Sequence, residues 1–93
     1  MSTKSDRRAA RKSVAAYHEV QLAELLEHVG AAIDSFRAGH LAAFEVDQML
    51  FQYSRAAKEL WKFCNLGDVE LTAKTVRERP PVDWWKLGAP RER

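Results

Sequence analysis

The chain has 93 residues, of which 46% are hydrophobic and 30% are charged, and its 15 Lys and Arg residues against 13 Asp and Glu leave a net charge of only +2. This composition is ordinary for a folded soluble protein, and it contains no internal repeat or low-complexity tract. The length favours a single small helical domain over residues 1–93.

Three further features narrow the class of protein. A single cysteine, Cys64, excludes an intramolecular disulfide. The charged N-terminus is not followed by an apolar segment, so it does not read as a secretory signal. No run approaches the roughly 18–20 apolar residues that a membrane span needs. We therefore expect a cytoplasmic protein without membrane contact.

The first predicted element is a long helix over residues 6–37, preceded by a disordered segment at residues 1–5. Ser5 is the expected N-cap. Helix-forming residues dominate the stretch, and apolar residues recur at heptad spacing, which is typical of an amphipathic helix. Gly39 marks its end, as glycine commonly does at a left-handed C-terminal position. The apolar positions are Ala15, Leu22, Leu25, Leu26, Val29, Ala32, Ile33 and Phe36.

The second predicted helix covers residues 43–64 and is closed by Gly67. Val46, Tyr53 and Leu60 recur every seven residues, and a second heptad series follows four positions later at Leu50, Ala57 and Cys64. Because the connection to the first helix is short, the two must pack as an antiparallel hairpin. The first helix is longer by about ten residues, so its basic N-terminal part should extend beyond the second helix.

A short third helix is predicted at residues 69–78, with Asp68 as its cap and Pro80-Pro81 ending it. The C-terminal segment, residues 79–93, contains one capped turn that carries Trp84 and Trp85. A tryptophan side chain can bury about 150–250 Å², so we expect at least one of them to fold back over the hairpin near the end of the second helix.

The aromatic residues of the second helix exceed what one neighbouring helix can cover, because Phe44, Phe51 and Trp61 lie outside its heptad stripe. We predict an apolar interaction surface, and pairing of two hairpins into a four-helix homodimer would bury it. Another protein could also occupy this surface. Alternatively, the third helix and the tryptophans could cover the excess within one chain. The predicted interaction residues are Phe44, Phe51, Trp61, Trp84 and Trp85.

Positive charge is concentrated in an N-terminal arm, where residues 1–12 carry a net charge of +4. The basic residues of the arm are Lys4, Arg7, Arg8, Arg11 and Lys12. On a helix, Arg7, Arg8, Arg11 and Lys12 fall on one side and could contact the phosphates of a nucleic acid. The alternative is a solvated helix end, since no aromatic residue is interleaved for base stacking. Ala9 and Ala10 are too small to anchor the helix to a membrane.

Residues for catalysis or metal binding are sparse. The neutral-pH acid–base candidates are His18, His28 and His40. Glu24 and His28 are four residues apart, whereas a di-iron bundle uses Glu-x-x-His, so a surface pair is the simpler interpretation. We predict no catalytic, cofactor-binding or metal-binding residues and no small-molecule substrate. A bundle metalloprotein using His18, Glu24 and His28 is the least favoured alternative.

The stretch from Gly39 to Cys64, with Phe44-Glu45-Val46-Asp47 and Arg55 to Cys64, resembles short uncharacterised bacterial helical proteins, and Asp83-Trp84-Trp85 is similar in kind. The resemblance implies a bacterial cytoplasmic protein and brings no activity with it. The sequence thus favours a non-enzymatic interaction or regulatory module, with a nucleic-acid-associated accessory protein as the alternative.

Overall fold

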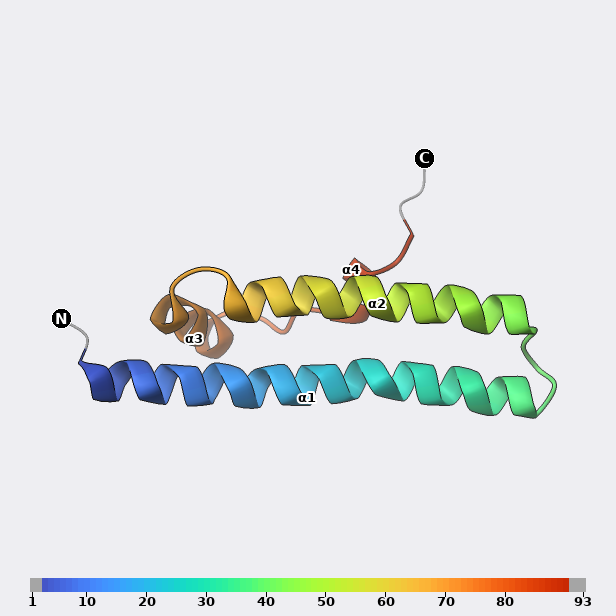
Figure 1. Cartoon of the computed structure of the whole chain (residues 1–93), viewed down its shortest axis with the longest axis horizontal. Helices are drawn as coiled ribbons and strands as arrows, with labels where there is room; N and C mark the ends of the chain where they lie inside the picture. Colours follow the sequence, from blue (N-terminus) through green and yellow to red (C-terminus); the bar gives the residue numbers. More distant parts are fainter. Residues whose placement is uncertain (1–2, 91–93) are drawn as a thin grey trace.

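The computed structural model describes residues 3–90 and confirms an all-α fold (Figure 1). Within these residues there is no strand, and no helix is long and apolar enough to cross a membrane. The helices are α1 (Lys4–Arg37), α2 (Ala43–Asn65), α3 (Val69–Glu78) and α4 (Trp84–Leu87).

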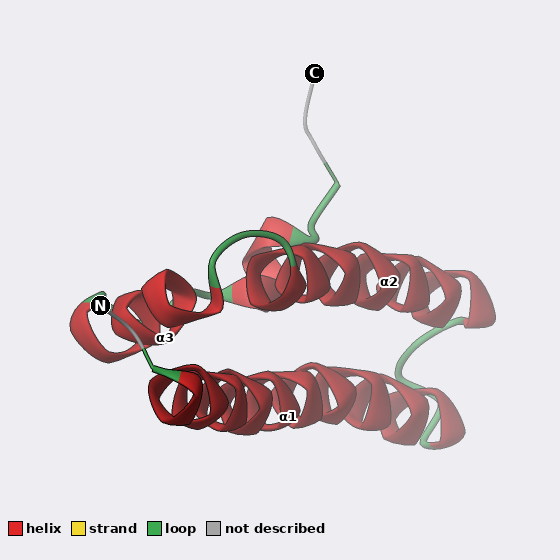
Figure 2. Ribbon diagram, turned by 60° about the vertical axis from the view of Figure 1, so that its left-hand side comes forward, coloured by secondary structure: helices red, strands yellow, loops and turns green. Residues whose placement is uncertain are grey.

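Helices α1 and α2 form the long antiparallel hairpin, as the short connection predicted (Figures 1 and 2). Gly39, with φ of 81°, provides the left-handed turn after α1. Leu25 of α1 packs against Ala56 and Leu60 of α2, and these side chains are almost completely buried. Trp84 of α4 completes this cluster of buried side chains.

The start of α1 corrects the sequence prediction. The helix begins at Lys4, and its N-cap is Thr3 instead of Ser5. The Thr3 hydroxyl accepts a hydrogen bond from the Asp6 N–H at 3.1 Å, and the Asp6 carboxylate accepts one from the Thr3 N–H at 3.2 Å. This reciprocal capping orders residues 3–5, which were predicted to be disordered. Residues 1 and 2 lie outside the described residues.

Helix α3 packs beside the part of α1 that α2 does not reach. The two hairpin helices have 34 and 23 residues, so α1 is longer by 11 residues, or roughly 16 Å at 1.5 Å per residue. We call this part of α1, residues 4–14, the overhang. Ala10 and Val14 of the overhang are buried against Ala73 of α3, with Cys64 and Val69 at the edge of the cluster (Figures 1 and 2).

Helix α4 returns the chain to the middle of the hairpin and packs mainly on α2. Asp83 caps it by accepting a hydrogen bond from the Lys86 N–H at 3.1 Å. Gly88 follows directly and touches α2 so closely that a Cβ atom there would lie 2.5 Å from the Gln52 carbonyl oxygen and 2.7 Å from the Ala56 Cβ. Close backbone approach, and not a left-handed conformation, therefore requires glycine at position 88.

Two glycine-to-alanine substitutions should have opposite effects on stability. Gly30 lies inside α1, and apart from the neighbouring backbone of the helix no atom lies within 4 Å of the place that an added methyl group would occupy, so Gly30→Ala should raise the free energy of unfolding by about 0.5–1 kcal/mol. Gly88→Ala should lower it by about 1–3 kcal/mol, because α4 must move away from α2. Urea denaturation of both variants tests this. An unchanged midpoint for Gly88→Ala would contradict the close contact.

Candidate interaction surfaces

Trp84 is a core residue and is removed from the predicted interaction surface. Its side chain is buried, and its ring centroid lies 5.4 Å from that of Phe63. The indole Nε1–H donates a hydrogen bond to the Tyr17 hydroxyl at 2.8 Å. Trp84 thus joins the hairpin near the end of α2, as expected for at least one of the two tryptophans, and satisfies its polar atom there.

Trp85 is half-buried on the same side of the hairpin. Its ring stacks on His28 of α1, with centroids 4.3 Å apart and an interplanar angle of 1°. The Gln52 side-chain amide donates to the Trp85 carbonyl oxygen at 2.9 Å, and the Arg55 Nε–H donates to the Gly88 carbonyl oxygen at 2.7 Å. Both carbonyls lie at the C-terminal end of α4, where the Trp85 carbonyl oxygen also accepts the Gly88 N–H at 3.1 Å, so α2 adds a second donor to one carbonyl and a donor to the other.

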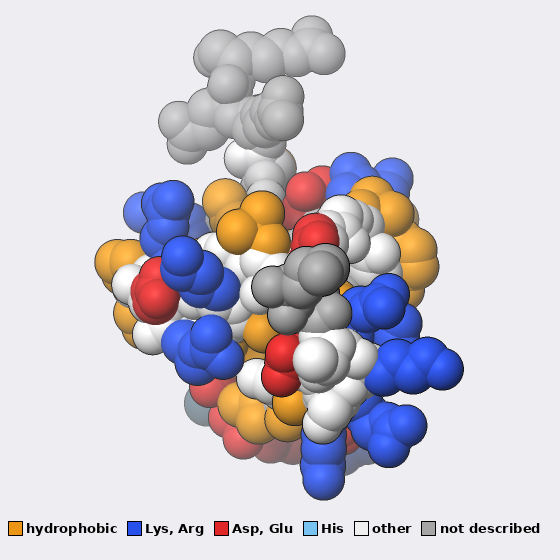
Figure 3. Space-filling view, turned by 90° about the vertical axis from the view of Figure 1, so that its left-hand side faces the viewer, with side chains coloured by type: hydrophobic (Ala, Val, Ile, Leu, Met, Phe, Trp, Pro, Cys, Tyr) orange, Lys and Arg blue, Asp and Glu red, His pale blue; other side chains and the backbone are white. Residues whose placement is uncertain are grey.

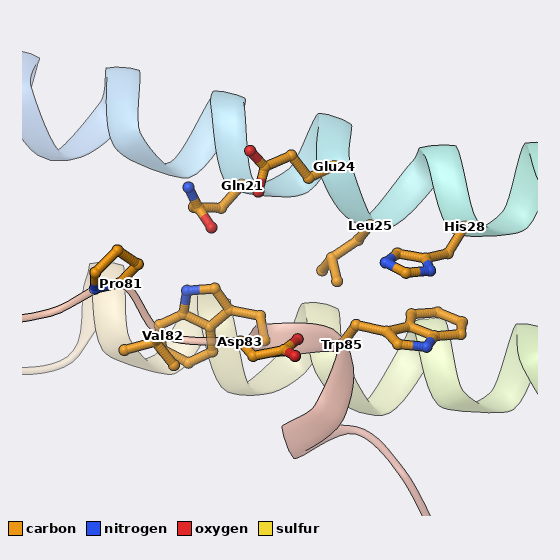
Figure 4. Close-up of a pocket in the computed structure, with 9 residues that line it drawn as sticks. Gln21, Glu24, Leu25, His28, Pro81, Val82, Asp83 and Trp85 are labelled. Carbon is orange, nitrogen blue, oxygen red and sulfur yellow. The ribbon is translucent and has the colours of Figure 1, made fainter.

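A hollow of about 250 Å³ lies between α1 and the C-terminal segment (Figure 4). Glu24 and His28 both line it, but Figure 4 shows the Glu24 carboxylate directed toward Gln21, while the His28 ring lies over Trp85. Among residues 3–90, no group of three His, Cys, Asp or Glu side chains is placed to hold a metal ion. His28 has instead an aromatic partner, which the sequence did not predict.

Two titratable groups near the hairpin core have shifted pKa values. Burial raises the pKa of the Tyr17 hydroxyl, and the hydrogen bond from Trp84 opposes this shift in part. Burial also raises the pKa of the Cys64 thiol. A raised thiol pKa disfavours the thiolate, so Cys64 acts as a small packing residue between α2, α1 and α3.

The other predicted aromatic residues are exposed but do not form one surface. Phe44 is 85% exposed, Phe51 53% and Trp61 51%. At about 100° per residue, Phe44 and Phe51 share one line along α2, whereas Trp61 shares a second line with Leu50. The two lines are about 100° apart on the outer side of α2, and each is about 130° from the buried Ala56. The structure therefore separates Trp61 from Phe44 and Phe51.

The side of the hairpin that carries Trp61 is not covered by α3 or α4. On α1, His28 faces α4, whereas Leu26 lies on the other side of Leu25. On α2, Gln52 and Arg55 face α4. Leu50 and Ala57 lie on the side of α2 that points away from α4. Because the helices are antiparallel, these turned-away positions lie together. We call this surface the open face, formed by Leu22, Leu26, Val29, Ile33, Phe36, Val46, Leu50, Tyr53, Ala57 and Trp61.

The open face is apolar and partly solvent-exposed. Leu26, Phe36, Leu50 and Trp61 are between 43% and 51% exposed, and its remaining residues are half-buried. From Leu22 to Phe36 and from Val46 to Trp61, the charged residues of both helices fall on other sides. Leu26 and Leu50 were expected to be part of the hairpin stripes. Leu25 and Leu26 are adjacent and about 100° apart, which could have indicated two separate contacts.

The predicted nucleic-acid residues lie on the overhang. Arg7, Arg8 and Arg11, together with Lys4, line a shallow hollow of about 210 Å³, whereas Lys12 is exposed outside it. Figure 3 views this end of the molecule and shows Lys and Arg side chains gathered along one flank, with α3 and its own basic side chains on the other. Lys4 belongs to the basic arm identified in the sequence but was left out of the predicted helical face, because residues 1–5 were not expected to be helical.

Comparisons of the chain with protein-family models, with curated proteins and with solved structures give no match. The fold and its surfaces define a class of protein: a helical hairpin in which the C-terminal segment covers one side and the open face forms the other.

The hydrogen bond between Trp84 and Tyr17 should be important for stability. Tyr17→Phe leaves the buried indole N–H without its acceptor, so the free energy of unfolding should fall by about 1–3 kcal/mol. Tyr53→Phe is the matched control at concentrations where the chain is monomeric, because the Tyr53 hydroxyl makes no hydrogen bond within the described residues, and its effect should stay within about 0.5 kcal/mol. Equal effects in urea denaturation at pH 7 would contradict this role.

Stability should also depend on Tyr17 at high pH. Its pKa in the folded chain is raised above the ordinary value of 10.0, so the folded state retains the proton longer than the unfolded state. This contribution is fully present below pH 10 and is lost as the pH rises through the folded pKa. Tyr17→Phe should therefore lose less stability than wild type between pH 9 and pH 11 in urea titrations. If the stability of wild type and of Tyr17→Phe falls equally over this pH range, the loss of stability comes from other titratable groups.

Proposed function

We propose that this chain is a non-enzymatic helical interaction module that pairs with a second copy through the open face, forming a four-helix bundle. The observation that carries the proposal is the open face itself. It presents exposed leucine and aromatic side chains from two helices and no charged side chain between its ends. Contiguous exposed apolar surface on a small protein usually marks a binding site.

The size of the open face supports a stable partner. Four of its ten residues, Leu26, Phe36, Leu50 and Trp61, are large hydrophobic side chains that are 43% to 51% exposed, so pairing would bury exposed apolar surface from both helices of each hairpin. The buried core of one hairpin is small, with eight buried hydrophobic residues among the described ones. A second layer of helices therefore adds apolar contacts that the short chain lacks.

The spacing of the open face supports a second copy in particular. On α1 the steps from Leu22 through Leu26, Val29 and Ile33 to Phe36 alternate between four and three residues. On α2 the same steps lead from Val46 through Leu50 and Tyr53 to Ala57. Helices pair with knobs-into-holes packing when both partners carry this repeat. Each hairpin provides two such helices side by side, as a four-helix bundle requires.

Two adjacent substitutions on α2 test the proposal. Leu50→Glu places a carboxylate in the open face, whereas Phe51→Glu places one at a similarly exposed position about 100° away. Leu50→Glu should raise the dimer dissociation constant at least roughly a hundredfold, because burying an unpaired charge costs more than about 2.8 kcal/mol. Phe51→Glu should leave the constant within about threefold of wild type.

Sedimentation equilibrium over a wide concentration range measures these constants. Circular dichroism verifies that both variants retain the helical content of the wild type. A wild-type chain that stays monomeric at every concentration would contradict self-pairing. A dimer that Phe51→Glu disrupts as strongly as Leu50→Glu would assign the interface to the side of Phe44 and Phe51 instead.

A further inference from the structure

We propose that the overhang of α1 binds the phosphate backbone of nucleic acid through Lys4, Arg7, Arg8 and Arg11. This inference is independent of self-pairing, because it concerns the part of α1 that extends past α2. The four residues occupy positions i, i+3, i+4 and i+7 of one helix, so their side chains share one face. They line one hollow of about 210 Å³, with no acidic residue among the lining side chains.

The positive charge of this face is not neutralised within the described residues. The only ion pair among residues 3–90 joins Glu59 and Lys62 on α2. Asp6, the one acid of the overhang, accepts the Thr3 N–H as part of the helix cap and lies on the flank facing α3, beside Glu70 and Arg77. The hollow therefore keeps its full charge for an external partner.

The chemistry of the face fits phosphates. Three of its four residues are arginines, whose planar guanidinium groups bind phosphate oxygens through two parallel hydrogen bonds. From Lys4 to Arg11 the helix rises about 10 Å, which equals about three phosphate intervals of one DNA strand at 3.4 Å of duplex axis each, and three intervals join four phosphates. The face is also at a helix N-terminus, where the macrodipole adds to its attraction for anions.

A membrane surface or an apolar peptide fits the overhang less well. The apolar side chains of the overhang that could anchor such a partner, Ala10 and Val14, are buried under α3. The exposed face therefore offers charge alone, whereas helices that lie on membranes need a large apolar face as well. Sequence-independent contact with a nucleic-acid backbone needs only the charge and its spacing.

Fluorescence anisotropy of a labelled 20-base-pair DNA duplex with the full chain tests the proposal. Four phosphate contacts predict that log K falls with log salt concentration with a slope of about −3.6. The quadruple variant Lys4→Gln, Arg7→Gln, Arg8→Gln, Arg11→Gln should bind at least roughly tenfold more weakly at 50 mM salt and show a slope between 0 and about −1.

A second quadruple variant controls for net charge. Arg37→Gln, Lys58→Gln, Lys62→Gln, Lys86→Gln makes the same change in charge away from the overhang and should bind within about threefold of wild type. Absence of binding at 50 mM salt, or equal losses in the two variants, would overturn the proposal. Equally tight binding of a poly-glutamate peptide, or tighter binding of phosphatidylglycerol vesicles, would also overturn it by assigning the face to another partner.

Discussion

The difference in length between the two hairpin helices determines where everything else in the molecule can lie. Helix α1 ends and helix α2 begins at the turn of residues 38–42, so the extra 11 residues at the N-terminal end of α1 project beyond Asn65. Val14 on that projection is an apolar side chain that α2 cannot cover. Ala73 of α3 covers Val14, and the chain after α3 then returns along the hairpin to form α4. The overhang thus obtains one packed flank and keeps one exposed, charged flank.

The return of the chain gives the hairpin two unequal sides. On one side, Trp84 fills the space between Tyr17 and Phe63, and the end of α4 is fixed by Gln52 and Arg55. A four-residue helix has almost no stability alone, because nucleation costs more than its few hydrogen bonds return. Burial of Trp84 stabilises α4, and so do the hydrogen bonds that the Gln52 and Arg55 side chains donate to carbonyl groups at its C-terminal end. The other side of the hairpin receives no such segment.

Much of the fold was predictable because its signals are local. Asp68 and Pro80 bracket α3, and Gly39 ends α1, so the ends of these helices follow from capping and backbone chemistry alone. The start of α1 was predicted two residues late, because both Thr3 and Ser5 can cap and only the reciprocal bond with Asp6 distinguishes them.

The surfaces were less predictable, because they depend on which side of the hairpin the C-terminal segment covers. Periodicity identified Phe44, Phe51 and Trp61 as lying outside the core stripe, but it could not reveal that α4 would pack beside one line and away from the other. The partners of α4 were also invisible in the sequence. Gln52 and Arg55 bind carbonyl groups 33 residues away, and a backbone acceptor carries no sequence signature.

One line along α1 changes its chemistry where α2 ends. Arg8, Ala15, Leu22, Val29 and Phe36 recur at intervals of seven, so they form a stripe that drifts by about 20° per heptad and covers about 80° of the helix surface. The stripe is basic on the overhang and apolar where α1 and α2 lie side by side, with the small Ala15 at the boundary. The open face of a second copy gains from the apolar length and meets only a desolvation cost on the basic length. A polyanion gains from the basic length and nothing from the rest. The two proposed partners therefore use separate lengths of the same helix, and the end of α2 sets the border between them.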